Sequence, residues 1–156
     1  MDSTIEKLVD LINNFDPASY LPDVTSLLGW TDLFIRVCVM AAPVILLLCG
    51  LRYLLLPPRE ANHEAGYRFF FGMGSVEAWR FTQLLAGIAW TALGLGLSLT
   101  MFFITGKFGE LNLMEAVDKA VVCIFWEIGL ILISYIAINL TLIIRYNHRG
   151  EVRWKK

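Results

Sequence analysis

Residues 81–106 read FTQLLAGIAWTALGLGLSLTMFFITG and contain no charged side chain. A helix needs roughly 20 mostly apolar residues to cross the hydrocarbon core of a bilayer, and this stretch is longer than that. Two more stretches qualify, at about 34–56 and at 120–144, and the latter contains a single charged residue, Glu127. The sequence therefore predicts an all-α integral membrane protein with three transmembrane helices.

The overall composition supports the same class of protein. Of the 156 residues, 57% are hydrophobic and 17% are charged, whereas a soluble domain is about half apolar and about a quarter charged. The length suits one domain. The cysteines lie inside the predicted spans and form no Cys-x-x-Cys pair, so we expect them to pack as small apolar residues. They are Cys38, Cys49 and Cys123.

Basic residues are divided unevenly between the two sides that three crossings create. The loop between the first two spans and the C-terminal tail contain Arg52, Arg59, Arg68, Arg80, Arg145, Arg149, Arg153, Lys155 and Lys156. The other side contains Lys7, Arg36, Lys107 and Lys119. The positive-inside rule then places the N-terminus outside and the C-terminus in the cytoplasm. Because the basic tail directly follows a span, we expect it to bind anionic lipid headgroups and not nucleic acid.

The N-terminal segment is acidic and amphipathic. Its apolar residues recur on one face of a helix, which predicts an amphipathic helix over residues 3–15. They are Ile5, Leu8, Val9, Ile12 and Phe15. We expect this helix either to lie on the outer membrane surface, or to cap the bundle or contact a partner.

We divide the chain into an extracytoplasmic amphipathic segment (1–30), a three-span transmembrane domain (31–146) and a basic cytoplasmic tail (147–156). A short helical piece precedes the first span, and Thr31 is placed to cap the span itself. Pro43 lies within that span and is expected to kink it.

Small residues follow one face of the second span. Gly87, Thr91, Gly94 and Ser98 are spaced by four, three and four residues, so they share a helix face. Such a face allows another helix to approach closely. The neighbouring helix belongs either to the same chain or to a second copy.

Glu127 is the ionisable residue placed deep in a span. Such a group is costly in a membrane and usually faces a bundle interior or a cavity. It can serve a proton or cation relay, or bind a cationic ligand. The alternative is a protonated carboxyl group that hydrogen-bonds inside the bundle.

The loop before the second span combines basic, aromatic and capping residues. Ser75 is a favourable N-cap, and Glu77 suits the positive end of the helix dipole. The free N–H groups at this helix start, together with Arg68 and Arg80, predict a small site for a phosphate, a lipid headgroup or a peptide carboxylate. The alternative is ordinary capping, with Arg, Tyr and Trp side chains anchoring the chain at the membrane interface.

Enzyme motifs are missing from the sequence. The run that starts at His63 begins like the HExxH zinc motif, but Tyr67 stands where the second histidine is needed. The other histidine, His148, is far along the chain, and the two form no metal or haem pattern. We therefore expect no catalytic residues, no cofactor and no metal.

The same loop resembles the signature of the bacterial SdpI family of membrane proteins, in which Gly-x-Arg is followed by Ser/Asn-x-Glu-x-Trp just before a span. The matching residues are Gly66, Arg68, Ser75, Glu77 and Trp79. The chain has Phe69 where the family commonly has Thr, and it has Thr82 and Gln83 where Asn or His is frequent. The resemblance covers roughly residues 41–144.

The resemblance implies a bacterial cytoplasmic-membrane protein, not an enzyme, that gives immunity to a secreted peptide toxin and transmits a signal to a cytoplasmic regulator. Two alternatives stay open: a small oligomeric transporter or channel that uses Glu127, and an accessory subunit of a larger membrane complex. The expected partners are membrane lipids, a peptide toxin, the regulator, and a second copy or larger complex. The candidate ligand- or partner-binding residues are Tyr67, Arg68, Ser75, Glu77, Trp79, Arg80 and Glu127.

Overall fold

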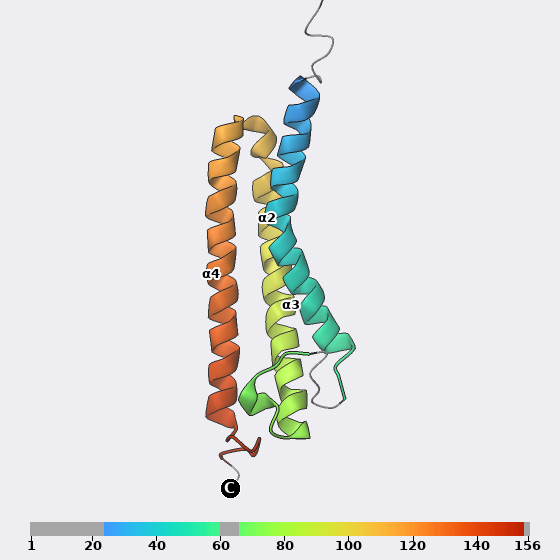
Figure 1. Ribbon diagram of the computed structural model, residues 1–156, viewed down its shortest axis with the longest axis vertical. Coiled ribbons are helices and arrows are strands. Elements are labelled where there is room, and N and C mark those ends of the chain that lie inside the picture. The colour runs from blue at the N-terminus through green and yellow to red at the C-terminus, as the bar shows by residue number, and fades with distance from the viewer. Residues whose placement is uncertain (1–23, 60–65, 155–156) are drawn as a thin grey trace, which may run out of the picture.

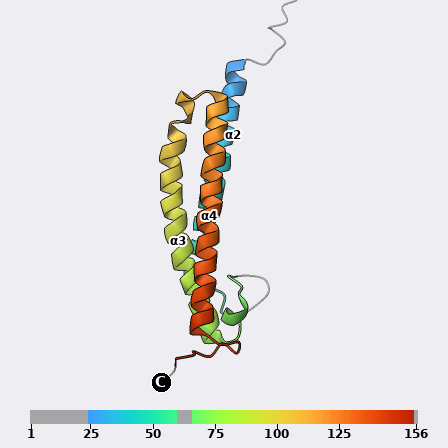
Figure 2. The same cartoon turned by 90° about the vertical axis from the view of Figure 1, so that its left-hand side faces the viewer.

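The computed structural model describes residues 24–59 and 66–154, with side chains described from residue 29 onward. In this part of the chain the long elements are three helices, α2 (Val24–Leu55), α3 (Val76–Gly106) and α4 (Leu113–Arg145). Two short turns of 3₁₀ helix, η2 (Phe70–Gly72) and η3 (Phe108–Glu110), lie between them. The long helices run side by side in alternating directions (Figures 1 and 2).

Each of the three helices is long and apolar enough to cross a membrane. This finding confirms the all-α class and the three predicted apolar spans. The amphipathic helix predicted over residues 3–15 lies outside the described residues.

One end of the bundle collects the arginines, and we call it the basic end. It comprises the end of α2, the start of α3, the end of α4 and the segments that follow or connect them (Figure 1). Its described arginines are Arg52, Arg59, Arg68, Arg80, Arg145, Arg149 and Arg153. At the opposite end, the short connection 107–112 joins α3 to α4.

The starts of α3 and α4 follow the capping rules. Ser75 caps α3, as predicted, and its side chain accepts a hydrogen bond from the Ala78 N–H, with Glu77 in the first turn. Asn112 caps α4 in the same way through the Glu115 N–H, at 3.0 Å.

The structure corrects the predicted start of the first span. Thr31 was expected to cap a new helix, but it lies well inside α2, which is continuous from Val24 to Leu55. No proline interrupts this region, and the single Gly29 costs only about 1 kcal/mol in a helix, too little to end it. Pro43 also lies inside α2, and this helix changes direction along its length (Figure 1). Proline removes a backbone donor, which is a common cause of such bends.

The small-residue face of α3 packs against α2 of the same chain. A Cβ atom added to Gly94 would lie 2.5 Å from the backbone nitrogen of Leu47, and one added to Gly87 would meet the Leu54 side chain. From the other side, Gly50 of α2 lies against the backbone of Thr91. The glycines let the two helix backbones approach closely. The sequence did not decide which helix packs against this face, and in the structure it is α2.

Large apolar side chains point away from the bundle along all three helices. Examples are Phe102, Phe125 and Ile133, which are between 63% and 70% exposed. The buried core is narrow and includes Val39, Leu46 and Met101. Outward apolar side chains on helices of this length suit contact with lipid tails.

Candidate functional site at the basic end

The predicted signature residues gather at the basic end of the bundle. The loop that follows α2 folds back over the start of α3, and the chain beyond α4 folds toward the same place (Figures 1 and 2). We call residues 66–83 together with 146–152 the cap. Because the cap touches all three helices, its internal bonds determine how the exposed side chains at this end are held.

Tyr67 is held by a pair of hydrogen bonds to one side chain of α3. Its backbone N–H donates to Gln83 Oε1 at 2.8 Å, and Gln83 Nε2 donates back to the Tyr67 carbonyl at 2.9 Å. Gly66 precedes it with φ +102°, and a Cβ atom there would lie 2.8 Å from Gln83 Oε1. The glycine is therefore needed both for its left-handed backbone and for the close approach of Gln83.

The Tyr67 side chain continues from the loop to α4. Its hydroxyl donates to Asn139 Oδ1 at 2.7 Å, and its ring contacts Trp90 edge-on at 5.3 Å between centroids. Burial raises the pKa of Tyr67 above its ordinary value. The phenol therefore stays neutral at physiological pH and keeps the proton that it donates to Asn139.

Trp79 joins α3 to the segment that follows α2. Its side chain is 0% exposed, and its Nε1–H donates to the Pro58 carbonyl at 2.9 Å. A buried indole requires a partner for its N–H group, and Pro58 supplies it. Trp79 thus fixes the position at which the chain leaves α2, one residue before Arg59.

Residues 146–152 form a tight folded turn. Tyr146 and Val152 pair in an antiparallel bridge. Inside the turn, the Asn147 side-chain oxygen accepts hydrogen bonds from the N–H groups of Arg149 and Glu151, both at 2.9 Å. The predicted basic tail therefore begins with an ordered turn.

This turn covers the start of α3. Ser75 Oγ donates to the Gly150 carbonyl at 2.7 Å while it accepts from the Ala78 N–H at 3.1 Å, so its donor and acceptor are both used. Gly150 has φ +72° and lies against the Ser75 backbone, where a Cβ atom would not fit. The chain's own turn therefore lies against the helix start at which the sequence predicts an anion site.

The two charged signature residues and the neighbouring Arg80 lie on the outside of the cap. Arg68, Glu77 and Arg80 are all exposed. Arg80 lines a cavity of about 260 Å³ together with Arg59, whereas Arg68 is not part of that cavity. The uncharged residues of the signature thus hold the cap together, whereas its charged residues lie exposed on the surface of the cap.

Glu127 lies near the middle of α4, far from the cap. Its side chain is 0% exposed, and neither carboxyl oxygen has a hydrogen-bond partner in the described part of the chain. In this structure it faces the bundle interior and is not on a surface that a ligand outside the bundle could touch. Among the described residues, no group of three His, Cys, Asp or Glu side chains is placed to hold a metal.

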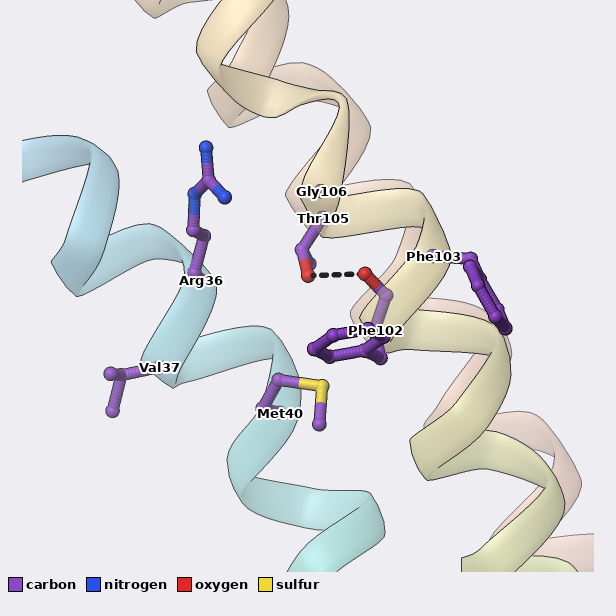
Figure 3. A pocket seen from close by; sticks show the side chains of 7 residues that line it. All are labelled: Arg36, Val37, Met40, Phe102, Phe103, Thr105 and Gly106. Carbon is purple, nitrogen blue, oxygen red and sulfur yellow. Dashed lines mark hydrogen bonds between the residues drawn. The ribbon is translucent and has the colours of Figure 1, made fainter.

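A second cavity lies at the opposite end, between α2 and α3. It measures about 390 Å³ and is lined mainly by apolar atoms of Val37, Met40 and Phe102, with Arg36 at its edge (Figure 3). The Arg36 guanidinium is already paired with Asp32 at 2.8 Å. This cavity therefore has no free cation to offer an anionic ligand.

Sequence reasoning missed three residues that hold the cap in place. Gln83 had been noted as a departure from the SdpI pattern, and the structure gives it the role of clamping Tyr67. Asn139 and Gly150 were not expected to contact the loop at all. One signal was present: Gln83 and Asn139 are amide side chains inside otherwise apolar stretches, where such groups need a partner.

The fold and the cap define a small all-helical protein with three helices able to cross a membrane and a folded basic end. No protein-family model, curated protein or solved structure matches this chain.

Proposed function

We propose that this protein is an immunity and signal-transducing protein of the bacterial cytoplasmic membrane, of the kind that the SdpI resemblance implies. In this proposal the cap faces the cytoplasm, and Arg68, Glu77 and Arg80 contact a cytoplasmic regulator. The observation that supports it is the division of the signature: its uncharged residues hold the cap together, and its charged residues are exposed.

The cap is suited to transmit a change in helix packing. It is bonded to α4 through Tyr67 and Asn139, and its two segments, the second of which directly follows α4, are joined through Ser75 and Gly150. A movement of α4 relative to α3 therefore has to displace or break these hydrogen bonds. A toxin that contacts the outer end of the helices would in this way alter the position of the exposed arginines.

The test is survival of a bacterium that is sensitive to a secreted peptide toxin and expresses the chain. Wild type is expected to protect the cells, and the triple variant Arg68→Ala, Glu77→Gln, Arg80→Ala is expected to lose protection. Each lost charge-assisted hydrogen bond weakens partner binding by about tenfold or more. The substituted side chains are exposed, so the variant should reach the membrane at wild-type abundance, which immunoblotting checks.

A matched control changes the same number of charges at the opposite end. The variant Lys107→Ala, Glu110→Gln, Lys119→Ala also removes two exposed cations and one exposed carboxylate. It should protect as well as wild type. The proposal fails if wild type gives no protection, or if the two triple variants behave alike at equal abundance.

A second candidate function is proton- or cation-coupled transport. The buried, unpartnered carboxyl group of Glu127 favours it, because an ionisable group inside a span is costly unless it is used or paired. An ion-flux assay in proteoliposomes tests this function, with Glu127→Gln as the variant because it keeps the shape of the side chain but cannot exchange a proton. Transport predicts proton or cation movement in wild type that Glu127→Gln loses. Signalling through the cap predicts no movement that depends on Glu127, and unchanged survival of cells that express Glu127→Gln.

A further inference from the structure

The cavity at the basic end has an apolar half and a basic half. It measures about 260 Å³ and lies between the end of α2 and the start of α3. Its lining residues are Tyr53, Leu54, Pro57, Pro58, Arg59, Arg80 and Leu84. The two halves are therefore built from different chemistry: hydrocarbon side chains on one side and two guanidinium groups on the other.

The two halves lie at different depths along α3. Arg80 and Leu84 are four residues apart, so they share one face of the helix about one turn apart. Leu84 lies further into the apolar span, and Arg80 lies at its start. A ligand that contacts both side chains must itself be apolar at one end and negatively charged at the other.

Arg59 lies at the same cavity as Arg80 because of the fold and not because of sequence proximity. The hydrogen bond from buried Trp79 to the Pro58 carbonyl fixes the residue next to Arg59. In the part of the chain that the structure describes, neither Arg59 nor Arg80 forms an ion pair, in contrast to Arg36, which is paired with Asp32. Two guanidinium groups beside one cavity favour a phosphate group, which accepts several hydrogen bonds at once.

We propose that this cavity binds one anionic phospholipid, with its phosphate between Arg59 and Arg80 and an acyl chain along Leu54 and Leu84. A lipid fits because its phosphate is complementary in charge to the two arginines, and because its acyl chain would reach the apolar residues that lie deeper in the span. The inference goes beyond the immunity proposal, because it concerns a lipid and not a toxin or a regulator. Its experiment uses purified protein, so its failure leaves the survival assay unaffected.

The test is native mass spectrometry of the full-length protein in neutral detergent with equal amounts of phosphatidylglycerol and phosphatidylcholine. Wild type should retain phosphatidylglycerol preferentially. The variant Arg59→Gln, Arg80→Gln should lose roughly 25-fold in this preference, since the net contribution of one hydrogen bond is roughly fivefold in binding and each of the two guanidinium groups loses one to the bound lipid. Leu84→Ser should weaken retention of the lipid as well.

The control variant Arg52→Gln, Arg149→Gln removes the same charge from exposed positions that do not line the cavity. It should keep the preference. If the control variant lost as much of the preference for phosphatidylglycerol as the Arg59 and Arg80 variant, the preference would come from general surface attraction. That result would overturn the proposed lipid site. Displacement of the lipid by millimolar inorganic phosphate, with no effect of Leu84→Ser, would show a site for the phosphate group alone and overturn the assignment to a lipid.

Discussion

Trp79→Ala is expected to lower the free energy of unfolding by about 3–5 kcal/mol, the usual cost of removing a fully buried aromatic side chain. Trp79 is 0% exposed and packs at the point where α3 meets the segment that leaves α2. The substitution leaves a large cavity and also strands the Pro58 carbonyl, which loses its hydrogen-bond donor.

Thermal unfolding of the purified protein in detergent measures this effect. Trp79→Phe should have an intermediate effect, because it keeps most of the ring packing but loses the bond to Pro58. Trp154→Ala is the matched control, since that indole is 79% exposed and should contribute little. Equal stability of the Trp79→Ala and Trp154→Ala variants would contradict the structure of the cap.

The second large effect is expected at the contact between α2 and α3. Gly94→Ala places a methyl group 2.5 Å from the backbone nitrogen of Leu47, and Gly50→Ala places one against the backbone of Thr91. Backbone atoms cannot rotate away as a side chain can, so the two helices must separate. Overpacking of this kind costs about 1–3 kcal/mol, and the two substitutions together should cost more than either alone.

Gly96→Ala provides a control on the same helix, because nothing lies within 4 Å of the added Cβ atom. It should leave stability unchanged or raise it by up to about 1 kcal/mol, since alanine is the better helix former. Unfolding midpoints of the three single variants in detergent give the comparison. If Gly96→Ala destabilised the protein as much as Gly94→Ala, helix propensity and not close packing would explain the glycines.

Much of the fold follows from local properties of the sequence. The three apolar stretches, the Ser75 cap and the Glu77 position depend on neighbouring residues alone, and the structure confirms them. The expectation at Thr31 was wrong because a good capping residue does not start a helix when the preceding residues are already helical. The partner of the Gly94 face could not be assigned, because small residues suit any close helix.

The cap was predictable only in part, since its bonds join residues far apart in the chain. The sequence located Ser75 and Trp79, but their partners Gly150 and Pro58 depend on how the tail and the α2 end fold back. Tyr67 and Asn139 are separated by 72 positions. Arg68 and Arg80 were expected to contribute to one anion site, whereas the cavity at this end is lined by Arg80 and Arg59 and not by Arg68.

The proposed function requires that three helices cross the membrane with the cap on the cytoplasmic side. The most direct test of this arrangement is the labelling of single cysteines by a membrane-impermeant maleimide, after replacement of Cys38, Cys49 and Cys123. The single cysteines are placed at four exposed positions, two at the basic end and two at the opposite end. They are Glu77, Arg149, Glu110 and Asp118.

The account predicts that cysteines at positions 110 and 118 are labelled in intact cells, whereas those at 77 and 149 are labelled only after the membrane is permeabilised. Labelling of the cysteines at 77 or 149 in intact cells would contradict the account, because the cap would then face outward.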